Sequence, residues 1–118
     1  MELSHLQIID WESAVKLAGG KREFAEEILD FLIMTLSDDI AALQHSYQAK
    51  NYSDLLRKAH KLHGALCYCG LPRLKALIVR LETDLKNNTM DNLPSLLTQL
   101  GSETTLLLKE VSLCKHAK

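Results

Sequence analysis

The chain has 118 residues, of which 47% are hydrophobic and 25% are charged, with 14 basic against 15 acidic side chains. This length fits one domain, and the apolar content is that of a chain that folds around a core rather than of a disordered segment. The formal net charge of -1 excludes a strongly basic nucleic-acid-binding protein and an acidic tail, although it allows local patches of one sign.

The residue types favour helices over strands. Leucine occurs 24 times, whereas valine and isoleucine together occur nine times, and there are only five glycines and two prolines. Sheet proteins need β-branched residues and turn formers, so we predict an all-α fold. The sequence has no apolar run of about 18 residues that would cross a membrane and no evident secretory signal. We therefore expect the three cysteines to be reduced thiols in a cytoplasmic protein.

Glycines, asparagines and prolines separate stretches whose apolar residues recur at helical spacing. The expected helices cover about residues 11–18, 22–48, 53–69, 72–85 and from about 92–94 onward. Asp10 is the expected N-cap of the first helix, a bend is expected in the second near Ser37–Asp38, and Gly101 indicates a bend or close packing in the fifth. Four long amphipathic helices with short connections predict an antiparallel four-helix bundle, with the short first helix capping one end.

The third expected helix has an unusual exposed face. Four apolar residues, which cluster within about 60° on a helical wheel, mark the direction of the core: Leu55, Ala59, Leu62 and Leu66. His60 lies roughly 130° from this direction, and Gly64 lies almost opposite it. Glycine in the middle of an exposed helix costs up to about 1 kcal/mol relative to alanine, and no cap or turn explains it here. Gly64 thus leaves space for something large to approach His60.

Basic residues surround this exposed histidine. Arg57 and Lys61 lie on the same side of the helix, and Lys58 lies nearer the flank. An exposed imidazole is a nucleophile near neutral pH, and nearby cations favour a phosphoryl group. The pattern therefore indicates a phosphate-accepting histidine with a cleared approach, and the alternative is an incidental surface histidine beside a tolerated glycine.

The segment from Ala59 to Gly70 resembles the signature of histidine-containing phosphotransfer (HPt) domains, which is H-x-[LIV]-[KR]-G followed six residues later by glycine. The matching positions are His60, Leu62, Gly64 and Gly70. The chain is most similar to the C-terminal HPt domain of hybrid sensor kinases of the BarA and GacS type. This similarity rests on the motif H-K-L-H-G, on the residues that follow it through Lys75, and on the opening Asp10-Trp11. His63 departs from the wider family, which usually has lysine or arginine at that position.

The resemblance implies a phosphorelay intermediate. His60 would take a phosphoryl group from the phospho-aspartate of a receiver domain through its outward Nε2, hold it as a phosphoramidate, and pass it to the aspartate of a second receiver. Gly64 would clear the approach, and His63 would hydrogen-bond a phosphate oxygen. The residues expected to meet the phosphate or the receiver are Arg57, Lys61, His63, Gly64, Cys67 and Arg73.

The expected partners are therefore receiver domains, with no nucleic acid and no direct membrane contact. There is no glycine-rich nucleotide loop, so we expect no ATP site and no autonomous kinase activity. We expect no cofactor in this chain, and we assign Mg²⁺ to the receiver because no carboxylate cluster is predicted to face His60. The chain is expected to be a monomer and to form the cytoplasmic C-terminal part of an inner-membrane sensor kinase.

Two other functions are compatible with the same sequence. A helical scaffold or interaction module would use the bundle without any chemistry at His60. A metal site is the second alternative, because His60, His63 and Cys67 lie within roughly 60° on one helix face at spacings i, i+3 and i+7, and all three are zinc ligand types. No second Cys/His pair at finger-like spacing supports it, and Cys67 with Cys69 forms C-x-C rather than a redox C-x-x-C motif.

Overall fold

The computed structural model describes the backbone of residues 2–116 and the side chains of residues 2–113. Within these residues the regular secondary structure is entirely helical, which confirms the all-α prediction. The helices are α1 (Trp11–Leu17), α2 (Arg22–Gln48), α3 (Tyr52–Leu66), α4 (Pro72–Lys86) and α5 (Leu93–His116). No helix in this part of the chain has both the length and the apolar composition needed to span a membrane.

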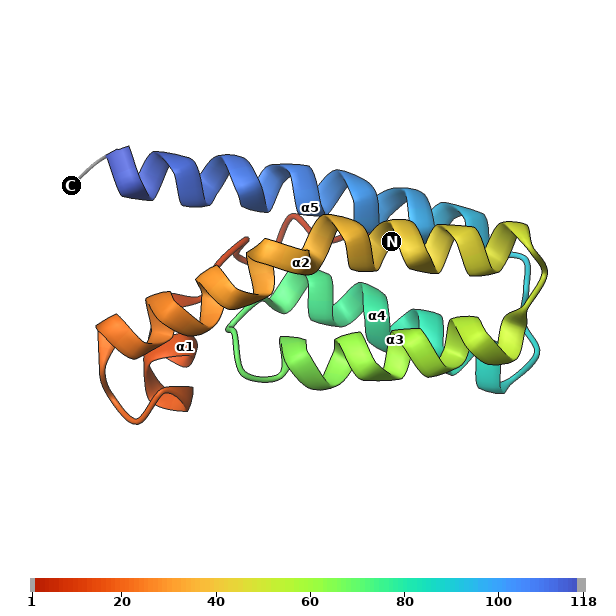
Figure 1. Ribbon diagram of the computed structural model, residues 1–118, viewed down its shortest axis with the longest axis horizontal. Coiled ribbons are helices and arrows are strands. Elements are labelled where there is room, and N and C mark those ends of the chain that lie inside the picture. The colour runs from red at the N-terminus through yellow and green to blue at the C-terminus, as the bar shows by residue number, and fades with distance from the viewer. Residues whose placement is uncertain (1, 117–118) are drawn as a thin grey trace.

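Helices α2 to α5 form an antiparallel four-helix bundle, as the sequence predicts (Figure 1). Each helix packs beside two others: α2 and α4 both contact α3 and α5. The molecule, with α1 and the N-terminal segment, measures 43 × 26 × 24 Å. Leucines from all four helices fill its centre and are fully buried, among them Leu36, Leu55, Leu77 and Leu100. The leucine stripes that define the helices thus also form the core that holds them together.

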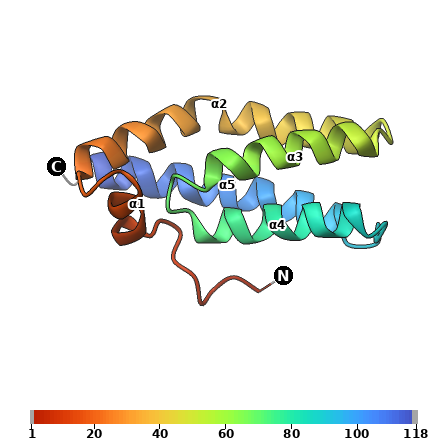
Figure 2. The ribbon, with the colours of Figure 1, turned by 90° about the horizontal axis from the view of Figure 1, so that it is seen from below.

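Helix α1 lies across one end of the bundle, beside the N-terminal half of α2 (Figure 2). Asp10 is its N-cap, as predicted, and the Asp10 carboxylate accepts a hydrogen bond from the backbone N–H of Ser13 (3.2 Å). The backbone N–H of Asp10 donates to the carbonyl of Gly70, 2.8 Å away. This bond attaches the start of α1 to the α3–α4 connection, so the short helix caps the bundle as expected.

Helix α3 ends at Leu66, three residues earlier than the predicted end at Cys69. The next residues form single turns, in which the N–H of Cys69 donates to the carbonyl of Leu66 (3.2 Å). Gly70 then takes φ of +63°, and a Cβ at this position would lie 2.6 Å from the carbonyl oxygen of Asp10. The apolar pattern continues through Cys69 although the helix does not, because the chain must already turn to start α4 at Pro72.

The two long helices behave differently at their predicted irregular points. Figure 1 shows α2 changing direction between its orange first half and its yellow second half, which agrees with the bend expected near Ser37–Asp38. Helix α5 continues through Gly101 without a break. A Cβ on Gly101 would lie 3.7 Å from the side-chain amide nitrogen of Gln44 on α2, which is an ordinary van der Waals contact, so neither a break in the helix nor close packing accounts for this glycine.

Candidate functional site

Helix α3 presents His60 on the outside of the bundle. The four core residues predicted from the helical wheel are all buried, and the His60 side chain is 75% exposed. Gly64, one turn later, is exposed, and a Cβ built on it would have no atom within 4 Å. The structure therefore has the open approach to His60 that the sequence predicts.

A buried carboxylate from α4 lies behind this histidine. Glu82 is 5% exposed, and its Oε2 is hydrogen-bonded to Nδ1 of His60 at 3.1 Å. Its other oxygen, Oε1, lies 2.8 Å from Nδ1 of His63. Both imidazoles of α3 thus direct the same ring nitrogen at one carboxylate, and we call His60, His63 and Glu82 the histidine–carboxylate cluster.

The hydrogen bond to Glu82 determines which ring nitrogen of His60 can react. An ionised carboxylate only accepts hydrogen bonds, so the neutral ring of His60 carries its proton on Nδ1 in this arrangement. Its lone pair is then on Nε2, the nitrogen on the exposed part of the ring. The geometry therefore supports Nε2 as the nucleophilic atom.

Sequence reasoning did not identify Glu82, the single carboxylate that contacts His60 among the described residues. Glu82 is 22 residues from His60 in the chain and lies on another helix. One signal was available, because Glu82 follows Ile78 by four residues and so shares the buried face of α4 with it. A charged residue on a core-facing stripe needs a partner, and here the partners are imidazoles.

Glu82 also has a permanent cation nearby. Lys86, one turn further along α4, has its Nζ 3.9 Å from Oε2 of Glu82 and a side chain that is 61% exposed. His63, at the position where lysine or arginine is usual in the family that the motif resembles, is 28% exposed. Lys86 therefore supplies a positive charge beside the cluster.

The predicted basic residues divide into paired and unpaired side chains. Arg57 and Lys58 both pair with Asp54 on the same helix, and the Lys58 Nζ lies 2.9 Å from Oδ2. Hydrogen bonds from Lys58, Arg57 and Ser46 hold the pKa of Asp54 well below its ordinary value. Lys61 forms no ion pair among the described residues, so it is the predicted cation whose charge is not already offset.

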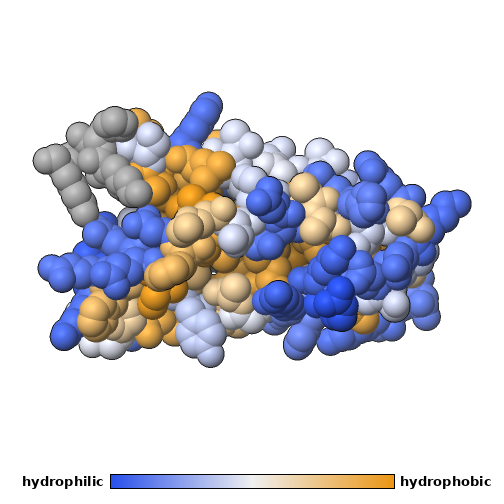
Figure 3. Space-filling model, in the orientation of Figure 1, coloured by the Kyte–Doolittle hydropathy of each residue, from blue (hydrophilic) through white to orange (hydrophobic). Residues whose placement is uncertain are grey.

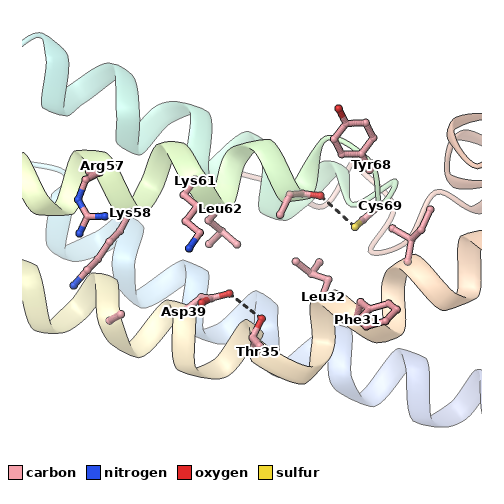
Figure 4. A pocket seen from close by; sticks show the side chains of 13 residues that line it. Phe31, Leu32, Thr35, Asp39, Arg57, Lys58, Lys61, Leu62, Tyr68 and Cys69 are labelled. Atoms are coloured by element: carbon pink, nitrogen blue, oxygen red, sulfur yellow. Dashed lines mark hydrogen bonds between the residues drawn. The ribbon is translucent and has the colours of Figure 1, made fainter.

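A groove of about 840 Å³ runs between α2 and α3 (Figure 4). Phe31 and Tyr68 line one end, and Arg57, Lys58 and Lys61 line the other. Phe31 is 74% exposed and Tyr68 is 63% exposed. Figure 3 shows hydrophobic surface gathered over the half of the molecule that contains the first half of α2 and the second half of α5.

The structure does not bring Arg73 to the histidine–carboxylate cluster, so its predicted phosphate contact is not supported, and its contact with a receiver stays a prediction. Its Nε donates to the carbonyl of Leu6 (2.9 Å), and its guanidinium lies 3.4 Å from Glu103 of α5. Arg73 precedes Glu82 by nine residues, so the two lie about 180° apart around α4. Its partners on α5 and in the N-terminal segment hold it on the far side of that helix.

The cysteines of α3 and its following turn are free thiols. Cys67 is half-buried at the C-cap of α3. Cys69 is buried, it donates to the carbonyl of Ala65 at 3.3 Å, and burial raises the pKa of its thiol to about 11. Both positions are consistent with the reduced thiols expected from the sequence, and the side chain of Cys114 lies outside the described residues.

The side chains that could bind a metal ion together in the structure are not the three that the sequence suggested. Among the side chains that the structure describes, ligand atoms of His60, His63 and Glu82 lie within 4.8 Å of one another. Cys67 is not a member of this group. Glu82 therefore takes the place of Cys67 in any metal site built on these two histidines.

Comparison with known proteins gives one consistent result. The GacS sensor histidine kinase of Pseudomonas protegens is 34% identical over 104 residues, which cover 83% of this chain and 11% of that kinase. The BarA signal transduction histidine-protein kinase of Escherichia coli K12 is 30% identical over 105 residues, covering 88% of this chain and 11% of that protein. The chain thus spans about a tenth of the length of these relatives.

A solved structure and a family model agree with these relatives. The crystal structure of the HPT domain from a Shewanella hybrid histidine kinase matches with a TM-score of 0.74 and 28% identity, covering 89% of this chain and 94% of that one. The Hpt domain family model matches residues 27–111, which include all three members of the histidine–carboxylate cluster. On this match, and with an exposed histidine on α3 of a four-helix bundle, the chain belongs to the Hpt domain family.

Proposed function

We propose that this chain carries a phosphoryl group between receiver domains of a two-component phosphorelay, with His60 as the phosphorylated residue. The observation that supports this most directly is an exposed imidazole whose Nδ1 is held by a buried carboxylate. The Nε2 lone pair attacks phosphorus, the N–P bond forms, and the bond from phosphorus to the receiver aspartate breaks. The aspartate leaves as a carboxylate, and the reverse steps deliver the group to the next receiver.

Glu82 is the positioning residue of this reaction. As Nε2 donates its lone pair, positive charge develops on the ring, and the Nδ1–H bond to Glu82 stabilises that charge. The same bond keeps the proton off Nε2 before attack. Lys86 lies close enough to the cluster to offset charge on the arriving phosphate, with His63 as a further donor.

The receiver docks on the face of α3 that carries Gly64 and on the groove between α2 and α3. Phe31 and Tyr68 supply exposed apolar contacts on this face, and Lys61 supplies a positive charge for acidic receiver residues. Cys67, the C-cap of α3, lies at the edge of this proposed docking surface, one turn beyond His63. Arg57 contributes less positive charge, because Asp54 already pairs with it.

The same proposal covers the cofactor, the oligomeric state and the location of the chain. The chain needs no cofactor of its own, the Mg²⁺ ion belongs to the receiver, and the domain has no kinase activity without a phosphorylated partner. It acts as a monomer in the cytoplasm, as the C-terminal part of an inner-membrane sensor kinase. It has no role in binding nucleic acid, in agreement with its net charge of -1.

The test is phosphoryl transfer from a phosphorylated receiver to the purified domain in the presence of Mg²⁺. We expect acid-labile phosphate on the wild-type chain and on His45→Gln, which changes another exposed histidine, on α2. We expect none on His60→Gln, which should fold normally by circular dichroism because the side chain is exposed. Absence of transfer from several receivers of verified phosphorylation would contradict the proposal.

A further inference from the structure

The histidine–carboxylate cluster has one feature that phosphoryl transfer does not require. Oε1 of Glu82 is fully buried and has no well-aligned hydrogen bond among the described residues, although Nδ1 of His63 lies only 2.8 Å away. A buried carboxylate oxygen without a hydrogen bond is costly, and such a group usually has a partner. Here both neighbouring groups, the carboxylate and the imidazole, are metal ligands.

The spacing of the ligand atoms fits a small divalent ion. One ligand atom each from His60, His63 and Glu82 lie within 4.8 Å of one another, and in both histidines Nδ1 is the ring nitrogen that lies next to the Glu82 carboxylate. Zinc binds imidazole nitrogen and carboxylate oxygen at about 2.0–2.2 Å, so ligand atoms around it lie roughly 3.3 Å apart. The His60–Glu82 contact of 3.1 Å and the His63–Glu82 contact of 2.8 Å already approach this separation.

Two histidines and one carboxylate are an established ligand combination for zinc with an open fourth position. The open position would take a water molecule, since the cluster borders the exposed ring of His60. Lys86 opposes a cation here, because its Nζ lies 3.9 Å from Oε2 of Glu82. Its side chain is 61% exposed, so it can turn into solvent when an ion enters.

We propose that His60, His63 and Glu82 bind a divalent transition-metal ion, with Zn²⁺ as the best fit, and that the bound ion switches off phosphoryl acceptance by His60. The ion takes the Nδ1 lone pair of each ring, so each neutral imidazole carries its single proton on Nε2 instead of Nδ1. Nε2 of His60 then has no lone pair to attack phosphorus. The ion is thus an inhibitor and not a cofactor of the transfer.

The binding half of this inference is independent of the proposed function, and the inhibitory half depends on it. Binding is measured on tag-free wild-type chain, by calorimetry with ZnCl₂ and by the visible absorption of Co²⁺ as a spectroscopic probe for tetrahedral coordination. We expect one ion per chain, with nitrogen and oxygen ligation. Calorimetry needs no phosphoryl donor, so its outcome does not depend on any relay partner.

Variants assign the ligands. Glu82→Gln and His63→Gln should each weaken Zn²⁺ binding at least about tenfold, because each removes a direct ligand. His45→Gln and Cys67→Ser should bind as the wild type does, since neither residue belongs to the cluster. Unchanged affinity in both Glu82→Gln and His63→Gln, or loss of binding in Cys67→Ser, would overturn the site. Zn²⁺ should also raise the melting temperature of the wild type but not of Glu82→Gln, which reports on binding to the folded chain.

The switch is tested with phosphoramidate, a small donor that needs neither a receiver nor Mg²⁺. In this reaction the N–P bond to ammonia breaks, the bond from Nε2 of His60 to phosphorus forms, and ammonia leaves. One equivalent of Zn²⁺ should slow phosphorylation of the wild type at least about tenfold, and EDTA should restore it. His63→Gln should react at the same rate with and without Zn²⁺. Equal wild-type rates with and without bound Zn²⁺ would overturn the inhibitory role.

Discussion

Glu82 and Asp54 each pair with two nitrogen-bearing side chains of α3, but the partners differ in kind. Asp54 holds Arg57 and Lys58, which are permanent cations from its own helix, and it also accepts a hydrogen bond from Ser46 of α2 at 2.8 Å. Glu82 reaches from α4 to two imidazoles. The permanently charged partners of Asp54 form a structural network that joins α2 to α3, which we call the Asp54 clamp. The imidazole partners of Glu82 can instead exchange protons and attack phosphorus.

The two carboxylates also differ in their surroundings. The Asp54 side chain is 24% exposed, and solvent screens its ion pairs. The Glu82 side chain is 7% exposed, so its interaction with His60 acts through less water. A carboxylate near two basic side chains is therefore not by itself a functional site. Its burial and the type of its basic partners indicate whether it stabilises the fold or takes part in chemistry.

The sharpest test of this comparison removes one charge at a time. Glu82→Gln should slow phosphorylation of His60 by phosphoramidate about tenfold or more, because the charge that develops on the ring loses its stabilising partner. Asp54→Asn should leave this rate within about twofold, because a small donor does not use the α2–α3 groove. The rates are read from the appearance of phosphohistidine by ³¹P NMR. Similar slowing in both variants would remove the distinction between the two carboxylates.

Space in front of His60 should matter almost as much as the charge behind it. Gly64→Gln should slow transfer from a phosphorylated receiver about tenfold, because the added side chain occupies the approach that is open in the structure. Gly64→Ala should instead raise the free energy of unfolding by up to about 1 kcal/mol, since nothing lies within 4 Å of the new methyl group and alanine favours the helix. Urea unfolding measures the second effect, and wild-type transfer rates in Gly64→Gln would contradict the first.

The sequence predicts His60 and Gly64 because both facts are local to one helix. A wheel of α3 shows which residues face away from the core, and glycine on that face has no other explanation. The apolar residues at helical spacing likewise predict correctly that α2 begins at Arg22 and ends at Gln48. Patterns that repeat within a single helix therefore carry most of the fold and the position of the reactive histidine.

Glu82 and Arg73 were not predictable in the same way, because their partners lie on other elements. The register that places Glu82 behind His60 depends on how α3 and α4 turn at Gly70, and helical periodicity does not contain that information. Arg73 lies close to the motif in sequence, but it pairs with Leu6 and Glu103. Its short distance from the motif along the chain suggested a phosphate contact. Packing against other elements instead determines its observed partners.

The exposed aromatic residues of α2 offer a smaller test of docking. Phe31→Ser should slow transfer from a phosphorylated receiver about fivefold, because the ring lines the groove and would be buried under the partner. Phosphorylation by phosphoramidate should not change. Phe24→Ser is the matched control, since this phenylalanine of α2 is 47% exposed but does not line the groove. Equal slowing of receiver transfer in both variants would argue against a defined contact at Phe31.

The smallest expected effect concerns the Asp54 clamp and appears only in acid. Lys58, Arg57 and Ser46 lower the pKa of Asp54 from its ordinary 3.8, so the folded chain binds this proton less readily than the unfolded chain does. The stabilisation is therefore complete above about pH 5 and is lost as the pH falls through and below 3.8. The difference in urea midpoint between wild type and Asp54→Asn should shrink steadily over this range. A difference that stays constant down to pH 2.5 would mean that Asp54 acts through its shape and not through its charge.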